Sequence, residues 1–123
     1  MAYTTVNDPS AYFQTTIYTG NGSTQNITNT GNSNLRPDWI WFKNRTNSPR
    51  DHVLIDSTRG VDLSLYSNQD SADQSLTDVV SSLNTDGFSL EANARSNENS
   101  ANQVAWQWAA GGATPSKTYR VVV

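Results

Sequence analysis

Two Trp-x-Trp motifs, one at Trp39 and Trp41 and one at Trp106 and Trp108, are the residues of this chain best suited to bind a ligand. Residues two apart in a strand point to the same side, so each motif places two indoles on one face. Exposed indoles at Trp106 and Trp108 would form a platform on which sugar rings stack. Gln107 on the opposite face could be solvated or could form a hydrogen bond with a sugar hydroxyl. Buried indoles would each add ~150–250 Å² to the core. We expect both pairs in the core, and Trp106, Gln107 and Trp108 are the candidate glycan-binding residues.

Carboxylates for acid–base catalysis could come from nine aspartates and two glutamates. A glycosidase places two carboxylates ~5–10 Å apart across the bond that it cleaves. Asp51 with Asp56, and Asp70 with Asp73, are the pairs that could be proposed. Aspartates in turns usually accept hydrogen bonds from their own backbone, so we expect neither pair to be catalytic.

Other patterns that could support catalysis or metal binding are incomplete. His52, Asp56 and Ser57 are the residue types of a triad, but sequence adjacency does not place a triad, and no Gly-x-Ser-x-Gly elbow is present. Residues 84–87 resemble part of a calcium loop, yet the position that should hold glutamate is Asn93. This excludes an EF-hand and leaves a lone surface calcium open. We therefore expect no catalytic residue, no cofactor and no resident metal, and we predict that the chain is not an enzyme.

Composition and charge narrow the class of protein further. The chain has 123 residues, the size of one domain, and 49 of them are Ser, Thr, Asn or Gln. Its 8 basic residues are scattered and its net charge is −3, which argues against nucleic-acid binding. It has no cysteine and no run of ~18 apolar residues, so the sequence predicts no thiol chemistry and no membrane span. The start of the chain lacks the basic and apolar regions of a secretory signal.

Short extended segments separated by turns must position these side chains. Thr, Val, Ile, Tyr and Trp are common and Gly–Asn or Asp–Gly turns recur, which favours strands. A hairpin is expected to close at Asp86-Gly87, and residues 93–100 are expected to form a polar loop. The spacing of Leu76, Val79, Val80 and Leu83 fits one short helix, and alternation fits residues 80–83 as a strand almost as well. The other expected strands cover residues 12–18, 25–28, 38–43, 52–56, 61–65, 104–110 and 118–123.

This pattern predicts an all-β fold, a single antiparallel β-sandwich of jelly-roll or concanavalin-like type with at most one short helix. We expect the sandwich to cover residues 1–112. Three bare valines at an unpaired edge would invite aggregation, so either that strand is paired within the sheet or with a neighbour, or the chain once ran further. We favour the second explanation and expect residues 113–123 to be a linker and the start of a further strand or domain. The expected core comprises Trp39, Ile40, Trp41, Phe42, Val53, Ile55, Leu63, Leu65, Phe88, Leu90, Trp106 and Trp108. Because the strand at residues 39–42 is apolar on both faces, a helix, loop or neighbouring subunit should cover its second side.

Several segments together resemble a module of tailed-phage virion proteins. They are YTGNGS at 18–23, RPDWIWFKNR at 36–45, HVLIDSTRG at 52–60, NTDGFSL at 84–90 and VAWQW at 104–108. The resemblance runs in order over residues 12–112. This chain departs from it at residues 32–35, where many relatives have a shorter Gly-aromatic turn, and at residues 109–110, which replace a more basic stretch.

The resemblance implies a lectin-like, concanavalin-type β-sandwich in a fibre or capsid-associated appendage of phages of aquatic bacteria. The expected function is that of a structural virion protein, acting by burial against identical subunits and other virion proteins. We expect a homotrimer, made in the bacterial cytoplasm and located in the virion. The alternative is a carbohydrate-binding module for host surface glycans, and a glycan hydrolase is a third hypothesis. The resemblance implies no catalytic residues.

Overall fold

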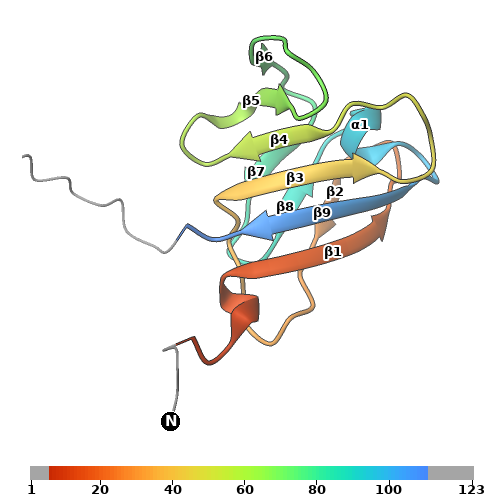
Figure 1. Cartoon of the computed structure of the whole chain (residues 1–123). Helices are drawn as coiled ribbons and strands as arrows, with labels where there is room; N and C mark the ends of the chain where they lie inside the picture. Colours follow the sequence, from red (N-terminus) through yellow and green to blue (C-terminus); the bar gives the residue numbers. More distant parts are fainter. Residues whose placement is uncertain (1–5, 111–123) are drawn as a thin grey trace, which may run out of the picture.

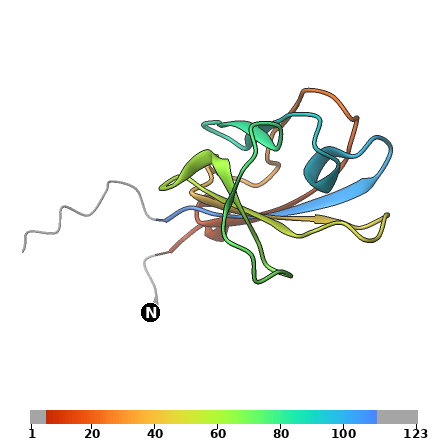
Figure 2. The ribbon, with the colours of Figure 1, turned by 90° about the horizontal axis from the view of Figure 1, so that it is seen from above.

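The computed structural model describes residues 6–110 and shows two antiparallel β-sheets packed in layers (Figures 1 and 2). The larger, six-stranded sheet has the order β1-β9-β3-β4-β5-β6, and the smaller, three-stranded sheet has the order β2-β8-β7. Every strand pairing is antiparallel. The predicted all-β sandwich is confirmed.

The described residues contain nine strands and two short helices. A 3₁₀ helix, η1 (Pro9–Ala11), precedes β1, and a single α-helix, α1 (Ala94–Asn97), lies between β8 and β9 in the described residues. The strands are β1 (Phe13–Thr19), β2 (Gln25–Ile27), β3 (Trp39–Asn44), β4 (Val53–Asp56), β5 (Gly60–Tyr66), β6 (Gln74–Ser75), β7 (Val80–Leu83), β8 (Phe88–Leu90) and β9 (Asn102–Trp108).

Strand β9, the last along the chain in residues 6–110, lies in the interior of the larger sheet between β1 and β3 (Figure 1). Trp108 is opposite Phe13 on one side and opposite Trp39 on the other. Chain segments far apart in sequence therefore meet in one row across three strands. No local pattern specifies such a row, because it depends on long-range pairing.

The core lies between the two sheets and is built from the inward side of each strand. Phe42 of β3 and Phe88 of β8 are fully buried, and their rings meet edge to face at 5.3 Å between centroids. Six residues predicted for the core are confirmed there: Ile40, Phe42, Val53, Ile55, Phe88 and Leu90. The buried cluster also contains Ile27, Tyr66, Val79, Val80 and Ala105.

The other six predicted core residues are wrong: Trp39, Trp41, Leu63, Leu65, Trp106 and Trp108 are not in the buried cluster. They alternate with buried residues along their strands and so lie on the outer face of the larger sheet. In β3 the buried set is Ile40, Phe42 and Asn44, which leaves the two indoles outside. Ile40 and Phe42 fill the layer between the sheets, and the larger indoles take the side that the smaller sheet does not cover.

Two local expectations are also corrected. The segment at 76–83 contains the strand Val80–Leu83, so the strand alternative is right and the helix is wrong. The expected loop at 93–100 contains α1, which begins after Asn93, whose side chain accepts a hydrogen bond from the Arg95 N–H. The expected hairpin at Asp86-Gly87 is confirmed by the pairing of β7 with β8. The expected strand at 118–123 and the expected linker lie outside the described residues.

Gly87 in that hairpin is predicted to be a position where any side chain destabilises the fold. Its φ is +94°, and a Cβ there would overlap the carbonyl oxygen of Ile27. Gly60 is the matched control, because its φ is +93° and a Cβ there meets nothing within 4 Å. Gly60→Ala should cost about 1 kcal/mol of unfolding free energy from backbone strain alone. Gly87→Ala should cost about 1 kcal/mol more, measured by urea denaturation, and equal losses would contradict the overlap with Ile27.

Candidate functional site

The strongest candidate site is a set of five aromatic side chains on the outer face of the larger sheet, which we call the aromatic face: Phe13, Trp39, Trp41, Trp106 and Trp108. Phe13, Trp108 and Trp39 form one row, with ring centroids 5.0 Å and 4.4 Å apart. Trp41 and Trp106 form a second row at 5.2 Å. Strand pairing aligns both rows, because each aromatic residue of β9 is opposite an aromatic residue of β3.

Apolar side chains extend the aromatic face along the sheet. Ile17 of β1 is 65% exposed, Phe13 is 40% exposed and Trp39 is 38% exposed. Leu54 and Leu65 are opposite one another on β4 and β5 and share this outer side. Contiguous exposed apolar surface of this kind marks an interaction site in soluble proteins. Figure 2, viewed from above, shows the smaller sheet and α1 together on the other side of the larger sheet.

The stacking geometry determines which parts of the indole rings a ligand could contact. Trp39 and Trp108 are stacked with only 26° between their planes, so each covers a flat side of the other. A sugar platform needs an open ring face together with hydrogen-bonding groups beside it. Mutually stacked rings instead present ring edges and aliphatic neighbours, and such a surface suits another protein surface.

Polar side chains beside the aromatic face are already engaged within the fold. Asp38 accepts hydrogen bonds from Ser57 Oγ at 3.0 Å and from the Ala110 N–H at 2.7 Å. Asp56, opposite Trp39, accepts from the Arg59 N–H at 2.8 Å and from Arg59 Nε at 2.6 Å. These carboxylates stabilise turns at the edge of the aromatic face. Their hydrogen bonds within the fold leave less capacity to accept hydrogen bonds from a glycan.

Gln107 does not join Trp106 and Trp108 in one site. Its side chain is fully buried between the sheets. Its Nε2 donates to Asn29 Oδ1 at 2.6 Å and to Thr16 Oγ1 at 2.9 Å, and its Oε1 accepts from Asn29 Nδ2 at 3.1 Å. The structure places the two indoles outside and the amide inside, so the three residues cannot contact one ligand.

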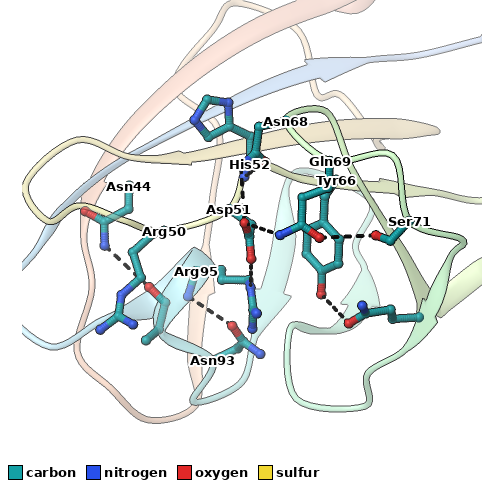
Figure 3. Close-up of polar contacts among 12 residues, drawn as sticks. Asn44, Arg50, Asp51, His52, Tyr66, Asn68, Gln69, Ser71, Asn93 and Arg95 are labelled. Atoms are coloured by element: carbon teal, nitrogen blue, oxygen red, sulfur yellow. Dashed lines mark hydrogen bonds and ion pairs between the residues drawn. The ribbon is translucent and has the colours of Figure 1, made fainter.

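A second candidate is a polar pocket of about 210 Å³ beside α1, whose surroundings are drawn in Figure 3. Arg50 pairs with Glu98 at 2.7 Å, and Arg95 pairs with Asp51 at 3.0 Å. The Arg95 guanidinium also lies 5.2 Å from the centre of the Tyr66 ring. Arg50 and Arg95 each pair with a carboxylate, and Asp78 accepts a hydrogen bond from Asn93 Nδ2 at 2.9 Å. These contacts hold the loop between β3 and β4 against α1 and leave little unpaired charge for a ligand. The lining of the pocket is Pro49, Arg50, Asp51, Asp78, Ala92, Asn93, Ala94 and Arg95.

The carboxyl of Asp51 at this pocket is held in its charged form. Partial burial raises its pKa, but hydrogen bonds donated by Arg95, Asn68 and Gln69 outweigh that effect and leave the pKa below its ordinary value. Figure 3 shows Asp51 with these partners converging on it. An acid poised to donate a proton near neutral pH would need the opposite shift.

Glu98 makes the stability of this region acid-sensitive. The hydrogen bond from Arg50, with further ones from Asn47 and Asn44, lowers its pKa to about 2. A depressed carboxyl pKa contributes stability that is complete above the unfolded value near 4.5 and is lost as pH falls toward 2. We expect Glu98→Gln to be less stable than the wild type at pH 7 and equal to it near pH 2, measured by denaturation across that range. A constant difference at every pH would contradict this assignment.

The other residues weighed for chemistry are separated. His52 precedes β4 and Asp56 ends it, while Ser57 Oγ donates to Asp38 rather than to either. Asp51 lies before β4 and Asp56 is its last residue, and each has its own arginine partner.

Further residues of this kind also have structural partners. Asp73 lies 3.6 Å from Arg59, and Asp86 accepts a hydrogen bond from the Leu35 N–H at 3.1 Å. Within residues 6–110, no group of three or more His, Asp or Glu side chains could hold a metal ion.

Phe13 and Ile17 belong to the apolar outer face and were missed as interaction residues. Phe13 and Ile17 alternate with Gln14 and Thr16, a pattern that predicts the apolar residues inside and the polar residues outside. In the structure Gln14 and Thr16 are buried, and Phe13 and Ile17 are exposed. The sequence of β3 contains the pattern that could have identified the outer face. Ile40 and Phe42 supply the inward apolar side of this strand, so Trp39 and Trp41 must lie on the opposite side.

These observations define an all-β sandwich whose most distinctive surface is an aromatic sheet face. A family described as a domain of unknown function, DUF7483, matches residues 8–122, and the chain belongs to that family. No curated protein and no solved structure matches the chain. In the described residues, no helix is long and apolar enough to cross a membrane.

Proposed function

We propose that this domain is a structural protein of a bacteriophage virion, acting through protein–protein burial. In this proposal it is the N-terminal domain of a fibre or a capsid-decorating appendage. The single observation that supports the mode of action is the aromatic face, with two aligned rows of rings and Ile17, Phe13 and Trp39 substantially exposed. The virion location rests on the resemblance of five ordered segments to phage appendage modules. Identical subunits and other virion proteins are the proposed partners.

The arrangement of the rings suits a permanent contact. Large aromatic side chains at the centre of an interface contribute most of its binding energy when a partner excludes water from them. Trp39 and Trp108 are held on paired strands and stack on one another, so they lose little freedom on binding. Burial of such a surface stabilises an assembly without any covalent or catalytic step.

The alternative function is glycan recognition by Trp106 and Trp108. Their position on the outer face favours it, because partly exposed indoles are common in sugar sites. The burial of Gln107 and the engagement of Asp38 and Asp56 within turns weigh against it. A glycan array probed with the purified chain separates the two functions: specific binding that Trp106→Thr abolishes would favour the glycan module over the structural one.

The proposed function is tested by removing the stacked indole pair. Trp39→Thr with Trp108→Thr keeps two strand-forming residues on the outer face, so the fold should be retained, as judged by the dispersion of the backbone amide signals in an NMR spectrum. Binding of the chain to phage particles that lack it should weaken at least about thirtyfold, the effect of losing one strong hot spot. Co-sedimentation and mass spectrometry of the particles measure this.

The matched control is Tyr12→Thr, because Tyr12 is an aromatic residue that is 48% exposed and makes no ring contact with the aromatic face. This variant should bind particles as the wild type does. Wild-type binding by the double tryptophan variant would contradict the proposal.

A further inference from the structure

Strand β1 forms one edge of the larger sheet within residues 6–110 (Figure 1). It is seven residues long and pairs only with β9 in the described residues. The other strands that end a sheet in the described part of the chain are shorter: β6 has two residues, β2 has three and β7 has four. Short edge strands are one way in which proteins prevent edge-to-edge association. Strand β1 lacks that protection.

The unpaired backbone groups of β1 can be identified from its pairing with β9. The Tyr12 C=O accepts from the Ala109 N–H at 2.9 Å, and the Gly20 N–H donates to the Ala101 C=O at 2.9 Å. Hydrogen-bonded positions alternate along an antiparallel strand, so the even-numbered residues face β9. The backbone groups of Phe13, Thr15, Ile17 and Thr19 therefore point away from β9, and among them the Thr19 C=O accepts a hydrogen bond from Gln25 Nε2 at 3.2 Å.

The side chains of β1 offer no other defence against pairing. The strand reads FQTTIYT and contains no charged residue and no proline, which are the usual protections of an edge. Its pairing with β9 is continuous over all seven residues, without a register shift. Ile17, which is 65% exposed, is beside this edge.

We propose that β1 is the site at which a second copy of this chain adds, antiparallel and around a two-fold axis at Thr16. In this register Thr15 of one copy is opposite Ile17 of the other, and both residues present backbone groups that point away from β9. The pairing is self-complementary because the strand carries no charge, so two-fold symmetry brings no like charges together. The outer faces of the two sheets then become one continuous surface.

This inference does not rest on the proposed function. It uses the backbone hydrogen-bonding groups at the edge of the sheet, whereas the proposed function uses the aromatic side chains on the outer face. Two-fold pairing closes with two copies. It does not produce the homotrimer expected from the resemblance. A trimer in solution would contradict the edge pairing and leave the aromatic face as a binding surface.

The first test is light scattering over a concentration series with Ile17→Lys and Ile17→Thr. The wild type and Ile17→Thr should reach the mass of two chains, because threonine keeps an uncharged, β-branched edge. Ile17→Lys should dissociate at least about tenfold more readily, because a lysine on an edge strand opposes pairing. A wild type that stays a single chain at all concentrations, or equal dissociation of the two variants, would overturn the proposal.

The second test fixes the register, using the absence of cysteine from the chain. Thr15→Cys and Ile17→Cys chains are mixed and oxidised gently, and intact mass spectrometry distinguishes the mixed disulfide from each homodimeric one. The mixed product should predominate, because Thr15 and Ile17 are directly opposite whereas like positions are diagonal. A statistical mixture of the three products would overturn the proposed register.

Discussion

Phe42→Ala is expected to lower the free energy of unfolding by about 3–5 kcal/mol. Phe42 is fully buried in β3 and meets the ring of Phe88 across the two sheets at 5.3 Å. Alanine would leave a cavity between rigid strands that cannot close around it. Urea denaturation monitored by circular dichroism measures the loss.

Phe13→Ala is the matched control, since it makes the same chemical change on the outer face. Phe13 is 40% exposed and has a tilted contact with Trp108 at 5.0 Å. Its loss should cost about 1 kcal/mol, the scale of one aromatic pair. If both variants lost equal stability, the assignment of inner and outer faces would be wrong.

Two glutamines on β9 are expected to respond in opposite ways to the same substitution. Gln103 and Gln107 are both fully buried on the inner face, four residues apart. Gln107 makes three hydrogen bonds with Asn29 and Thr16, whereas the amide of Gln103 has no hydrogen-bond partner among the described residues. Their side chains therefore differ in polar pairing and not in burial.

Gln107→Met should lower the unfolding free energy by about 3 kcal/mol, roughly 1 kcal/mol for each hydrogen bond. Gln103→Met should raise it by about 1–2 kcal/mol, because an unpaired buried amide is replaced by an apolar side chain of similar length. Each variant serves as the control of the other in thermal and urea denaturation. Equal losses would show that the Gln103 amide is satisfied in the folded protein.

The alternation of apolar residues correctly predicted most strands and the sandwich, because a period of two follows directly from extended backbone. It predicted the inward positions of Ile40, Phe42, Val53 and Ile55, which occupy one side of β3 and β4. The hairpin at Asp86-Gly87 followed from local turn chemistry. These features depend on neighbours in sequence.

The orientation of β9 could not be predicted in the same way. Its inner face carries Gln103 and Gln107 and its outer face carries Trp106 and Trp108, which is the reverse of the usual rule. The amide of Gln107 is buried at little cost only because Asn29, distant in sequence, pairs with it. A sequence rich in Asn, Gln, Ser and Thr can place polar networks inside, and the partners of each network come from long-range contacts.

The candidate site was predicted in part. The tryptophan motifs were identified as its most informative residues, but the combination of Trp106, Gln107 and Trp108 in one glycan site required them to share a face. The contributions of Phe13 and Ile17 depend on the pairing of β1 with β9, which joins the two ends of the described chain. The paired charges beside α1 likewise join Arg50 to Glu98 and Asp51 to Arg95 across the fold.

The central claim is that the aromatic face is open in the isolated chain and covered in its assembly. Hydroxyl-radical labelling read by mass spectrometry tests it residue by residue, with the buried Phe88 as the internal reference. We predict strong oxidation of Trp39 and Trp108 in the free chain and strong protection of both in purified phage particles. Protection of both in the free chain, or equal oxidation in the free chain and the particle, would contradict the claim.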